Sequence, residues 1–360
     1  MEKRIAFYEG CLLGMAAGDA LGCAVDDKTL EQILEDYGPN GLMGYDTPGD
    51  AAEVSTHTQL AALAANGLLA ALTRGKTGEY PRFVALALRE WLRSRYSNTA
   101  EEGDLCWLNR IPALLRRNST DARVTDSLHR ERLGTVDAPV NRADTPSALM
   151  VPVAVGLFYQ PGRIEPGQIG LLGAEASALI CGAPEAFLSG AAVSYIIAGI
   201  LHAPEVPLAE QFMQTATIIR SQFSKRFPQA AEVATAISLG VRLSRQPQLQ
   251  PGDVLEDLVC QRASQCLTGA ICACLAHPDS FDDALVAAVN HSGKSGAVAA
   301  LTGAIMGAKL GAEAIPAFYL ETLESAPYLE ELARDIAIGS PTSGLFDDSW
   351  EQKYSFGMPV

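Results

Sequence analysis

Apolar residues recur every three to four positions along most of this chain, which is the pattern of helices that bury one face. Residues 4–24 show it first, with Cys11, Leu12, Met15 and Ala16 on one side. Strict alternation of apolar and polar residues is nearly absent, so the pattern predicts an all-α protein. The same spacing predicts further helices at 55 or 56–73, about 81–95, 105–117, 147–158, 168–181, 184–202, 207–223, 228–244, 252–275, 279–289, 296–311 and 327–337.

Two polar stretches interrupt this pattern. Residues 28–53 carry turn signals at 36–42 and 47–50, and residues 98–145 contain loops after the short predicted helix at 105–117. Neither stretch has a composition that marks it as a linker between domains, and the chain has no repeat of fixed period. We therefore expect one compact all-α domain over residues 1–340, followed by an irregular tail over residues 341–360.

Glycines recur every four residues on two of the predicted helices. Glycine is less favourable than alanine by about 1 kcal/mol in a helix interior, so a repeated glycine face needs a structural reason. The usual reason is a second helix packed very close to that face. We expect the two striped helices to pack on each other and to bring both ends of the chain into the core. The glycines are Gly14, Gly18 and Gly22 near the N-terminus and Gly303, Gly307 and Gly311 near the C-terminus.

Composition narrows the possible partners and the location. The 360 residues are 48% hydrophobic and only 7% aromatic, which favours one large core of tightly packed helices. The net charge of −15 leaves no basic stripe for a phosphate backbone, so nucleic acid is excluded as a partner. The chain begins without the apolar stretch of a signal peptide and shows no long uninterrupted apolar run. We expect a cytoplasmic protein, not bound to a membrane, whose eight cysteines are reduced core residues.

A polar turn, HSGKSG at residues 291–296, precedes the second glycine-striped helix. A helix N-terminus offers free N–H groups and the positive end of the helix dipole, so this turn is a candidate anion site with Lys294 above it. A buried helix preceded by a glycine turn explains the same residues. The turn is not a P-loop, because Ala288 stands where that motif needs glycine and a helix precedes it instead of a strand.

Two other segments carry candidate chemistry. At the start of the helix near residue 56, Ser55 or Thr56 explains the polar residues as an N-cap, and His57 is a candidate base. A zinc pair is not predicted there, because neither a histidine nor a carboxylate follows His57 by four residues. Asp26 and Asp27 follow the first helix and could bind a metal or a sugar, or form a solvated turn.

Taken in order, these segments resemble the ADP-ribosylglycohydrolase family, which includes dinitrogenase-reductase-activating glycohydrolase and hydrolases of ADP-ribosyl-arginine and ADP-ribosyl-serine. The resemblance covers about residues 5–335. It rests on GCLLGMAAGDALG at 10–22, STHTQL at 55–60, and AAVNHSGKSGAVAALTGAIMGAKLG at 287–311 followed by AEAIP. It implies a central cleft for ADP-ribose, and an ADP-ribose-type small molecule or an ADP-ribosylated protein as the partner.

The family's chemistry uses two divalent cations, usually Mg²⁺, held by carboxylates and a threonine. Asp26 matches a position where the family has glutamate, and residues 55–58 replace Thr-Asp-Asp-Thr, so that both aspartates are lost. Residues 294–297 replace Asp-Ser-Asp-Thr and put a lysine at a ligand position. Because Mg²⁺ needs oxygen ligands, and mainly carboxylates, we predict that the dinuclear site is absent and that no metal or other cofactor is bound. Lys294 would then occupy the cation's place beside Asp26.

Three functions fit these residues. The chain could bind ADP-ribose or a related nucleotide with lost or altered catalysis. It could be an active hydrolase with a metal-free or rearranged site, using Asp26 or His57 as the base and Lys294 to stabilise negative charge. It could also be a pseudoenzyme that only binds partners. We expect Asp19 to brace the cleft rather than to act as a ligand, and Arg142 is a weaker candidate. The predicted ligand-binding residues are Ser55, Thr56, Asn141, His291, Ser292, Gly293, Ser295 and Gly296.

Overall fold

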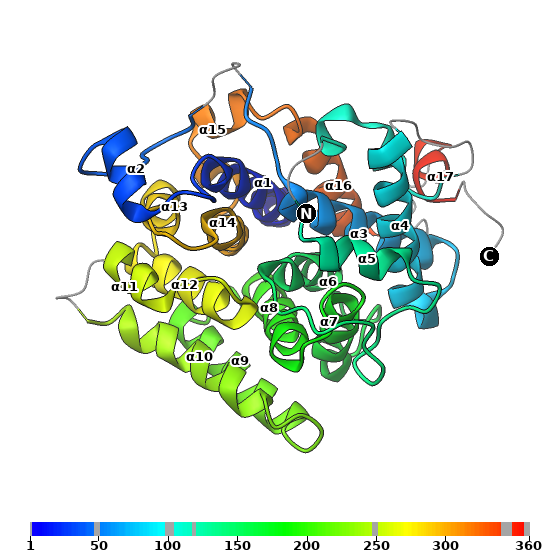
Figure 1. The fold of residues 1–360 in the computed structure, drawn as a ribbon. Coiled ribbons are helices and arrows are strands. Elements are labelled where there is room, and N and C mark those ends of the chain that lie inside the picture. The colour runs from blue at the N-terminus through cyan, green and yellow to red at the C-terminus, as the bar shows by residue number, and fades with distance from the viewer. Residues whose placement is uncertain are drawn as a thin grey trace.

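The computed structural model describes residues 2–46, 51–97, 104–116, 120–246, 251–339 and 348–355. The predicted turn at 47–50 and most of the predicted tail lie outside these ranges. The α-helices are α1 (Glu2–Cys23), α2 (Leu30–Tyr37), α3 (Thr56–Thr73), α4 (Tyr80–Ser97), α5 (Ala122–His129), α6 (Val151–Phe158), α7 (Ile169–Ala178), α8 (Pro184–His202), α9 (Leu208–Phe223), α10 (Ala230–Leu243), α11 (Pro251–Leu258), α12 (Ala263–Ala276), α13 (Phe281–Val289), α14 (Ser295–Leu310), α15 (Ala317–Glu321), α16 (Ala326–Ile338) and α17 (Asp348–Tyr354) (Figure 1).

Short 3₁₀ helices connect several of these elements. They are η1 (Thr77–Glu79), η2 (Trp107–Arg110), η3 (Pro112–Leu114), η4 (Pro146–Leu149), η5 (Pro166–Gln168) and η6 (Ala312–Ala314). Among the described residues the only strand-type pairing is an isolated bridge between Ala52 and Leu323. The predicted all-α fold is therefore confirmed.

Helices α1 and α14 form the antiparallel pair that the glycine pattern predicts, and they lie side by side in the core (Figure 1). A Cβ atom on Gly14 would overlap the carbonyl oxygen of Gly303, and one on Gly18 would overlap that of Ala299. Further along, a Cβ on Gly22 would lie only 2.6 Å from the Cα of Gly296. The two backbones therefore touch along the helices, and at these glycine positions even the Cβ atom of an alanine would overlap backbone atoms.

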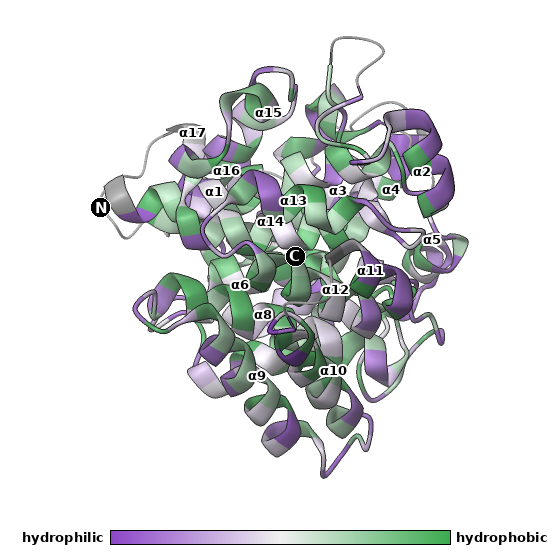
Figure 2. Ribbon diagram, turned by 90° about the vertical axis from the view of Figure 1, so that its left-hand side faces the viewer, coloured by the Kyte–Doolittle hydropathy of each residue, from purple (hydrophilic) through white to green (hydrophobic). Residues whose placement is uncertain are grey.

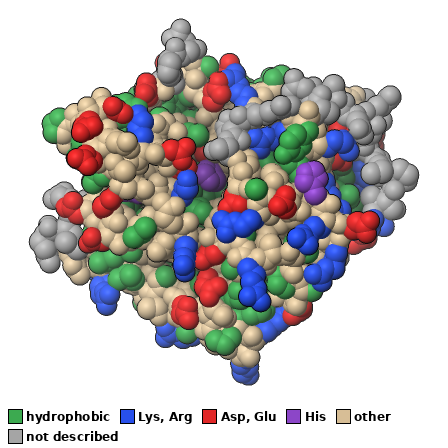
Figure 3. Space-filling view, in the orientation of Figure 1, with side chains coloured by type: hydrophobic (Ala, Val, Ile, Leu, Met, Phe, Trp, Pro, Cys, Tyr) green, Lys and Arg blue, Asp and Glu red, His purple; other side chains and the backbone are tan. Residues whose placement is uncertain are grey.

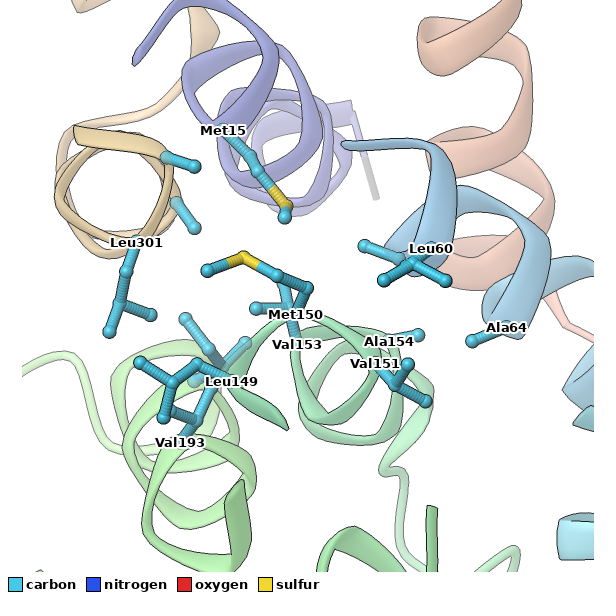
Figure 4. Packing of buried hydrophobic residues seen from close by; sticks show 14 of the residues in the cluster. Met15, Leu60, Ala64, Leu149, Met150, Val151, Val153, Ala154, Val193 and Leu301 are labelled. Atoms are coloured by element: carbon cyan, nitrogen blue, oxygen red, sulfur yellow. The ribbon is translucent and has the colours of Figure 1, made fainter. Parts of the chain in front are cut away.

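Other helices pack their apolar faces around this pair. Met15 of α1 and Leu60 of α3 point toward Met150, which directly precedes α6, and Leu301 of α14 points toward Leu149 (Figure 4). All of these side chains are almost completely buried. Hydrophobic residues concentrate on the central helices α6, α8 and α14, whereas α2, α5 and α11 carry many hydrophilic residues (Figure 2).

Helix α8 is the one described helix that is long and apolar enough to cross a membrane, by length and composition alone. Within its most apolar window, 78% of the residues are buried inside the protein. Burial in the core accounts for its apolar character, as it does for many core helices.

The predicted helix at 252–275 is wrong, because the chain breaks there into α11 and α12. The break lies at Val259 and Cys260, whose φ angles are +65° and +42°. A β-branched residue rarely adopts this left-handed conformation, so nothing in the local pattern indicated a break. The break also has a structural use, since the carbonyl of Cys260 accepts a hydrogen bond from the Lys294 amide at 2.9 Å.

Three other stretches differ from the prediction. The predicted helix at 105–117 is instead the pair of 3₁₀ helices η2 and η3, and the two predicted loop regions contain α2 and α5. Within the predicted irregular tail, residues 348–354 form α17. Its Tyr354 is fully buried and donates a 2.6 Å hydrogen bond to Asp335, while Trp350 donates to Thr73 at 3.1 Å. These contacts, far away in sequence, stabilise a helix too short to be stable alone.

Candidate functional site

A cavity of about 420 Å³ opens where the N-termini of α3, α5 and α14 meet the loop after α1. Six of the residues predicted to be catalytic or ligand-binding line it: Asp26, Ser55, Thr56, His57, Lys294 and Gly296. Acidic and basic side chains gather beside a histidine near the middle of one face of the molecule (Figure 3). The remaining lining residues are Cys23, Asp27, Thr120, Asp121, Arg123, Asp144, Thr145, Pro146, Ser147 and Gln261.

Asp19, near the end of α1, holds the first turn of α3 against the cavity. Its carboxylate is fully buried and accepts hydrogen bonds from the Ser55 amide at 2.8 Å and the Thr58 amide at 3.1 Å. The hydroxyls of Ser55 and Thr58 donate to it at 2.6 and 2.7 Å. The first N–H groups of a helix lack partners within the helix, and Asp19 satisfies part of that need from another element. This geometry supports the predicted bracing role.

His57 lies on the cavity wall and is tied to Asp19. Its Nδ1 is 3.3 Å from Asp19 Oδ1 and 3.1 Å from Ser55 Oγ, and its side chain is 17% exposed. Burial by itself would lower the pKa of the imidazole, but the hydrogen bond with Asp19 and the aspartate charge outweigh it and raise that pKa. Burial by itself would raise the pKa of Asp19, and the contacts with His57, Ser55 and Thr58 lower it instead. Among the described residues, Nε2 of His57 has no hydrogen-bond partner.

Asp26 occupies the N-terminus of α14, where the sequence predicted an anion site. Its Oδ1 accepts a 2.9 Å hydrogen bond from the Gly296 amide, and the next two amides of the helix donate to the Lys294 carbonyl. The helix end therefore holds an anion, but the anion is a carboxylate of the same chain. This arrangement leaves little of the predicted backbone site for a phosphate.

Lys294 extends its ammonium group between two carboxylates of the loop after α1. Nζ lies 3.4 Å from Asp26 Oδ2 and 3.7 Å from Asp27 Oδ1. Partial burial by itself would lower the pKa of Lys294, but the charges of both aspartates outweigh it, so the pKa is raised and the lysine stays charged. The ammonium therefore supplies a fixed positive charge at the cavity wall.

Four residues of the HSGKSG turn, 291–293 and 295, do not line the cavity. His291 is fully buried; its Nδ1 accepts from the Gly293 amide at 2.9 Å and its Nε2 donates to the Ala288 carbonyl at 3.1 Å. Burial lowers its pKa to about 4, so it is neutral at physiological pH. Ser292 donates to Glu256 at 2.7 Å and accepts from the Leu30 amide at 2.8 Å.

Ser295, Gly293 and Asn141 are also used within the fold. Ser295 donates to the His291 carbonyl at 3.0 Å, and Gly293 is enclosed so closely that a Cβ would lie 2.7 Å from His291 Nδ1. The Asn141 amide donates to the Ile180 carbonyl at 2.8 Å and accepts from the Gly182 amide at 2.8 Å. None of these three residues, nor His291 or Ser292, lines the cavity, so their placement gives no support to direct ligand contact.

The cavity is also lined by residues that sequence reasoning missed. Asp121 is the N-cap of α5, and Arg123 donates to its carboxylate from both Nε and Nη2, the latter at 2.6 Å. Thr120 lies 2.7 Å from the Thr56 hydroxyl and accepts from Arg95 at 2.9 Å. The aspartate before a short helical segment was an available N-cap signal, but the segment was interpreted as loop.

The residues at this site do not fit two hard cations. In the described part of the chain no group of three or more histidines, cysteines, aspartates or glutamates could hold a metal ion. Asp26 is the one matched carboxylate, and the Lys294 ammonium already lies beside it. An ammonium repels a cation at this distance and offers no lone pair, so the matched positions provide one carboxylate where Mg²⁺ relies mainly on carboxylate ligands.

Comparison with known proteins identifies the family. A family model described as ADP-ribosylglycohydrolase matches residues 2–345. The chain belongs to this family. It is similar to an uncharacterized protein of Archaeoglobus fulgidus (strain ATCC 49558), with 26% identity over 340 residues that cover 92% of this chain and 95% of the relative. A solved ADP-ribosylglycohydrolase-related protein complex shares the fold, with a TM-score of 0.60 and 19% identity over 93% of this chain and 98% of its own.

Proposed function

We propose that this family member binds ADP-ribose, free or attached to a protein, in a cavity that works without divalent cations. The observation that carries the proposal is the Lys294 ammonium between Asp26 and Asp27. Membership in the ADP-ribosylglycohydrolase family supports the ligand class. The positions that match the family's metal motifs carry a lysine and a histidine on the cavity wall.

The charge of Lys294 explains how the cavity could accept a diphosphate without divalent cations. ADP-ribose carries a diphosphate, which the carboxylates of Asp26 and Asp27 would repel if they faced it alone. Lys294 lies 3.4 and 3.7 Å from them and partly neutralises that corner of the cavity. Arg123, which also lines the cavity, provides a second cation and is paired with Asp121. Two cationic side chains therefore stand among the aspartates of the cavity without a metal ion.

The test removes the ammonium and keeps the length of the side chain. Lys294→Met leaves Asp26 and Asp27 unbalanced, so we expect ADP-ribose, titrated calorimetrically in EDTA, to bind on the order of tenfold more weakly, a loss of about 1.4 kcal/mol. Lys28→Met is the matched control, because Lys28 also pairs with an aspartate, Asp36 at 2.8 Å, but does not line the cavity. The affinity of the Lys28→Met variant for ADP-ribose should stay close to that of the wild type. Equal affinities for Lys294→Met and wild type would contradict the proposal.

A further inference from the structure

The contact between Asp19 and His57 gives the cavity a feature that binding alone does not require. A fully buried carboxylate holds one ring nitrogen of His57, and the ring lies on the cavity wall. The other nitrogen, Nε2, has no partner among the described residues. A histidine oriented by a buried carboxylate on one nitrogen and open on the other is the arrangement used for proton transfer.

We propose that His57 is a general acid that protonates the leaving group when the bond between ADP-ribose and a protein side chain is hydrolysed without metal, and that Asp19 is its positioning residue. This inference rests on the proposed function, because it requires ADP-ribose in the cavity. Asp26, on the same cavity, accepts the proton of the attacking water. The family's divalent cations have no part in this step.

The reaction balances with these two groups. The oxygen of a water molecule attacks the anomeric carbon of the ribose and gives one proton to Asp26. The bond from that carbon to the side-chain oxygen or nitrogen breaks with its electron pair, and the leaving atom takes the Nε2 proton of His57. The products are ADP-ribose and the free side chain. Asp26 and His57 then return to their starting states by proton exchange with water.

The charges around His57 favour the protonated form that an acid needs. Asp19 on α1 and Asp26 in the following loop raise its pKa, while burial and Lys294 at the start of α14 lower it, and the net shift is upward. Asp121 and Arg123, which also line the cavity, pair with each other. Turnover should therefore decline as pH rises through the pKa of His57, because the acid form is lost.

The decisive experiment compares two leaving groups in EDTA. One substrate is ADP-ribose joined to a serine peptide, whose alkoxide leaves only with a proton. The other is ADP-ribose joined to 4-nitrophenol, which leaves as a stable anion. We expect His57→Gln to lower kcat on the serine substrate by about 10²- to 10⁴-fold, the usual contribution of a general acid, and to change the nitrophenyl reaction far less. His129→Gln, an exposed histidine outside the cavity, is the control and should leave both reactions unchanged.

Asp19→Asn adds a readout that a structural role would not produce. It should move the alkaline limb of the serine-peptide pH profile to lower pH, because His57 loses its negative partner. If the Asp19→Asn variant does not fold, the effect of His57→Gln on the two substrates tests the acid role by itself. Equal losses on both substrates would overturn the acid role. Binding of ADP-ribose without any wild-type turnover in EDTA would overturn this inference and leave the proposed function standing.

Discussion

At the scale of single residues, Asp19 organises the cavity without being placed to touch a ligand. It accepts hydrogen bonds from Ser55 and Thr58 and holds His57, so three residues of α3 depend on one buried carboxylate. A carboxylate without such partners would be costly to bury. The position of His57 on the cavity wall therefore depends on the same contacts that stabilise the start of α3.

Protonation of His57 makes this contact depend on pH. The pKa of His57 is raised in the folded protein, so its stabilising contribution is complete below the unfolded pKa of about 6.5 and is lost as pH rises through the folded value. We expect His57→Gln to lower the free energy of unfolding by roughly 1–2 kcal/mol near pH 6, and by less as pH rises through the folded pKa of His57. Urea denaturation at several pH values measures this.

His129→Gln serves as the control for that series, because His129 is exposed and lies outside the cavity. A difference in the free energy of unfolding between wild type and His57→Gln that stays constant across the pH range in which His57 titrates would show that the pair with Asp19 gains no stability from the charge on the imidazole.

The sequence identified some of these residues but could not assign their partners. His57 and Lys294 stood out because they replace residues of a family motif, and both line the cavity. His291 and Asn141 stood out equally, yet they are used in hydrogen bonds within the fold. The same types of polar residue line the cavity and form hydrogen bonds within the fold. Only the tertiary contacts show which of the two roles a given residue has. Arg123 was missed because its helix has only 8 residues and was interpreted as loop.

At the scale of elements, the close pair of α1 and α14 places two walls of the cavity. The loop that carries Asp26 follows α1, and Lys294 is the N-cap of α14, so the backbone contact between the helices sets their spacing. Glycine periodicity was enough to predict this pair. The break between α11 and α12 was not predictable, because Val259 takes a conformation that its residue type disfavours.

Adding one methyl group to the contact between α1 and α14 tests this account. A Cβ on Gly303 would overlap the carbonyl oxygen of Gly14, and backbone cannot move aside as a side chain can. We expect Gly303→Ala to destabilise the protein by roughly 3 kcal/mol, the upper end of the usual range for overpacked sites, measured by urea denaturation. Gly78→Ala is the control, since nothing lies within 4 Å of the added atom, and it should change stability by less than about 0.5 kcal/mol. Equal changes in the free energy of unfolding for Gly303→Ala and Gly78→Ala would contradict the close packing of α1 and α14.

At the scale of the whole molecule, the cavity forms because segments far apart in sequence converge. Asp26, His57, Asp121 and Lys294 come from four separate helices or the loops beside them, and all face one space. The all-α class and the family could be predicted from spacing and motifs, and both are confirmed. The shape of the cavity was not predicted, because it depends on a short helix, α5, that was interpreted as loop and on a helix break that the local pattern did not indicate.

The central claim is that ADP-ribose binds here without divalent cations. The most direct measurement is a calorimetric titration of the full chain with ADP-ribose, run once in Mg²⁺ and once in EDTA. The account predicts the same affinity in both, because the Lys294 ammonium is already beside Asp26. Binding in Mg²⁺ that disappears in EDTA would contradict it and would mean that other residues rebuild a metal site. Failure to bind in either condition would contradict the proposed ligand class itself.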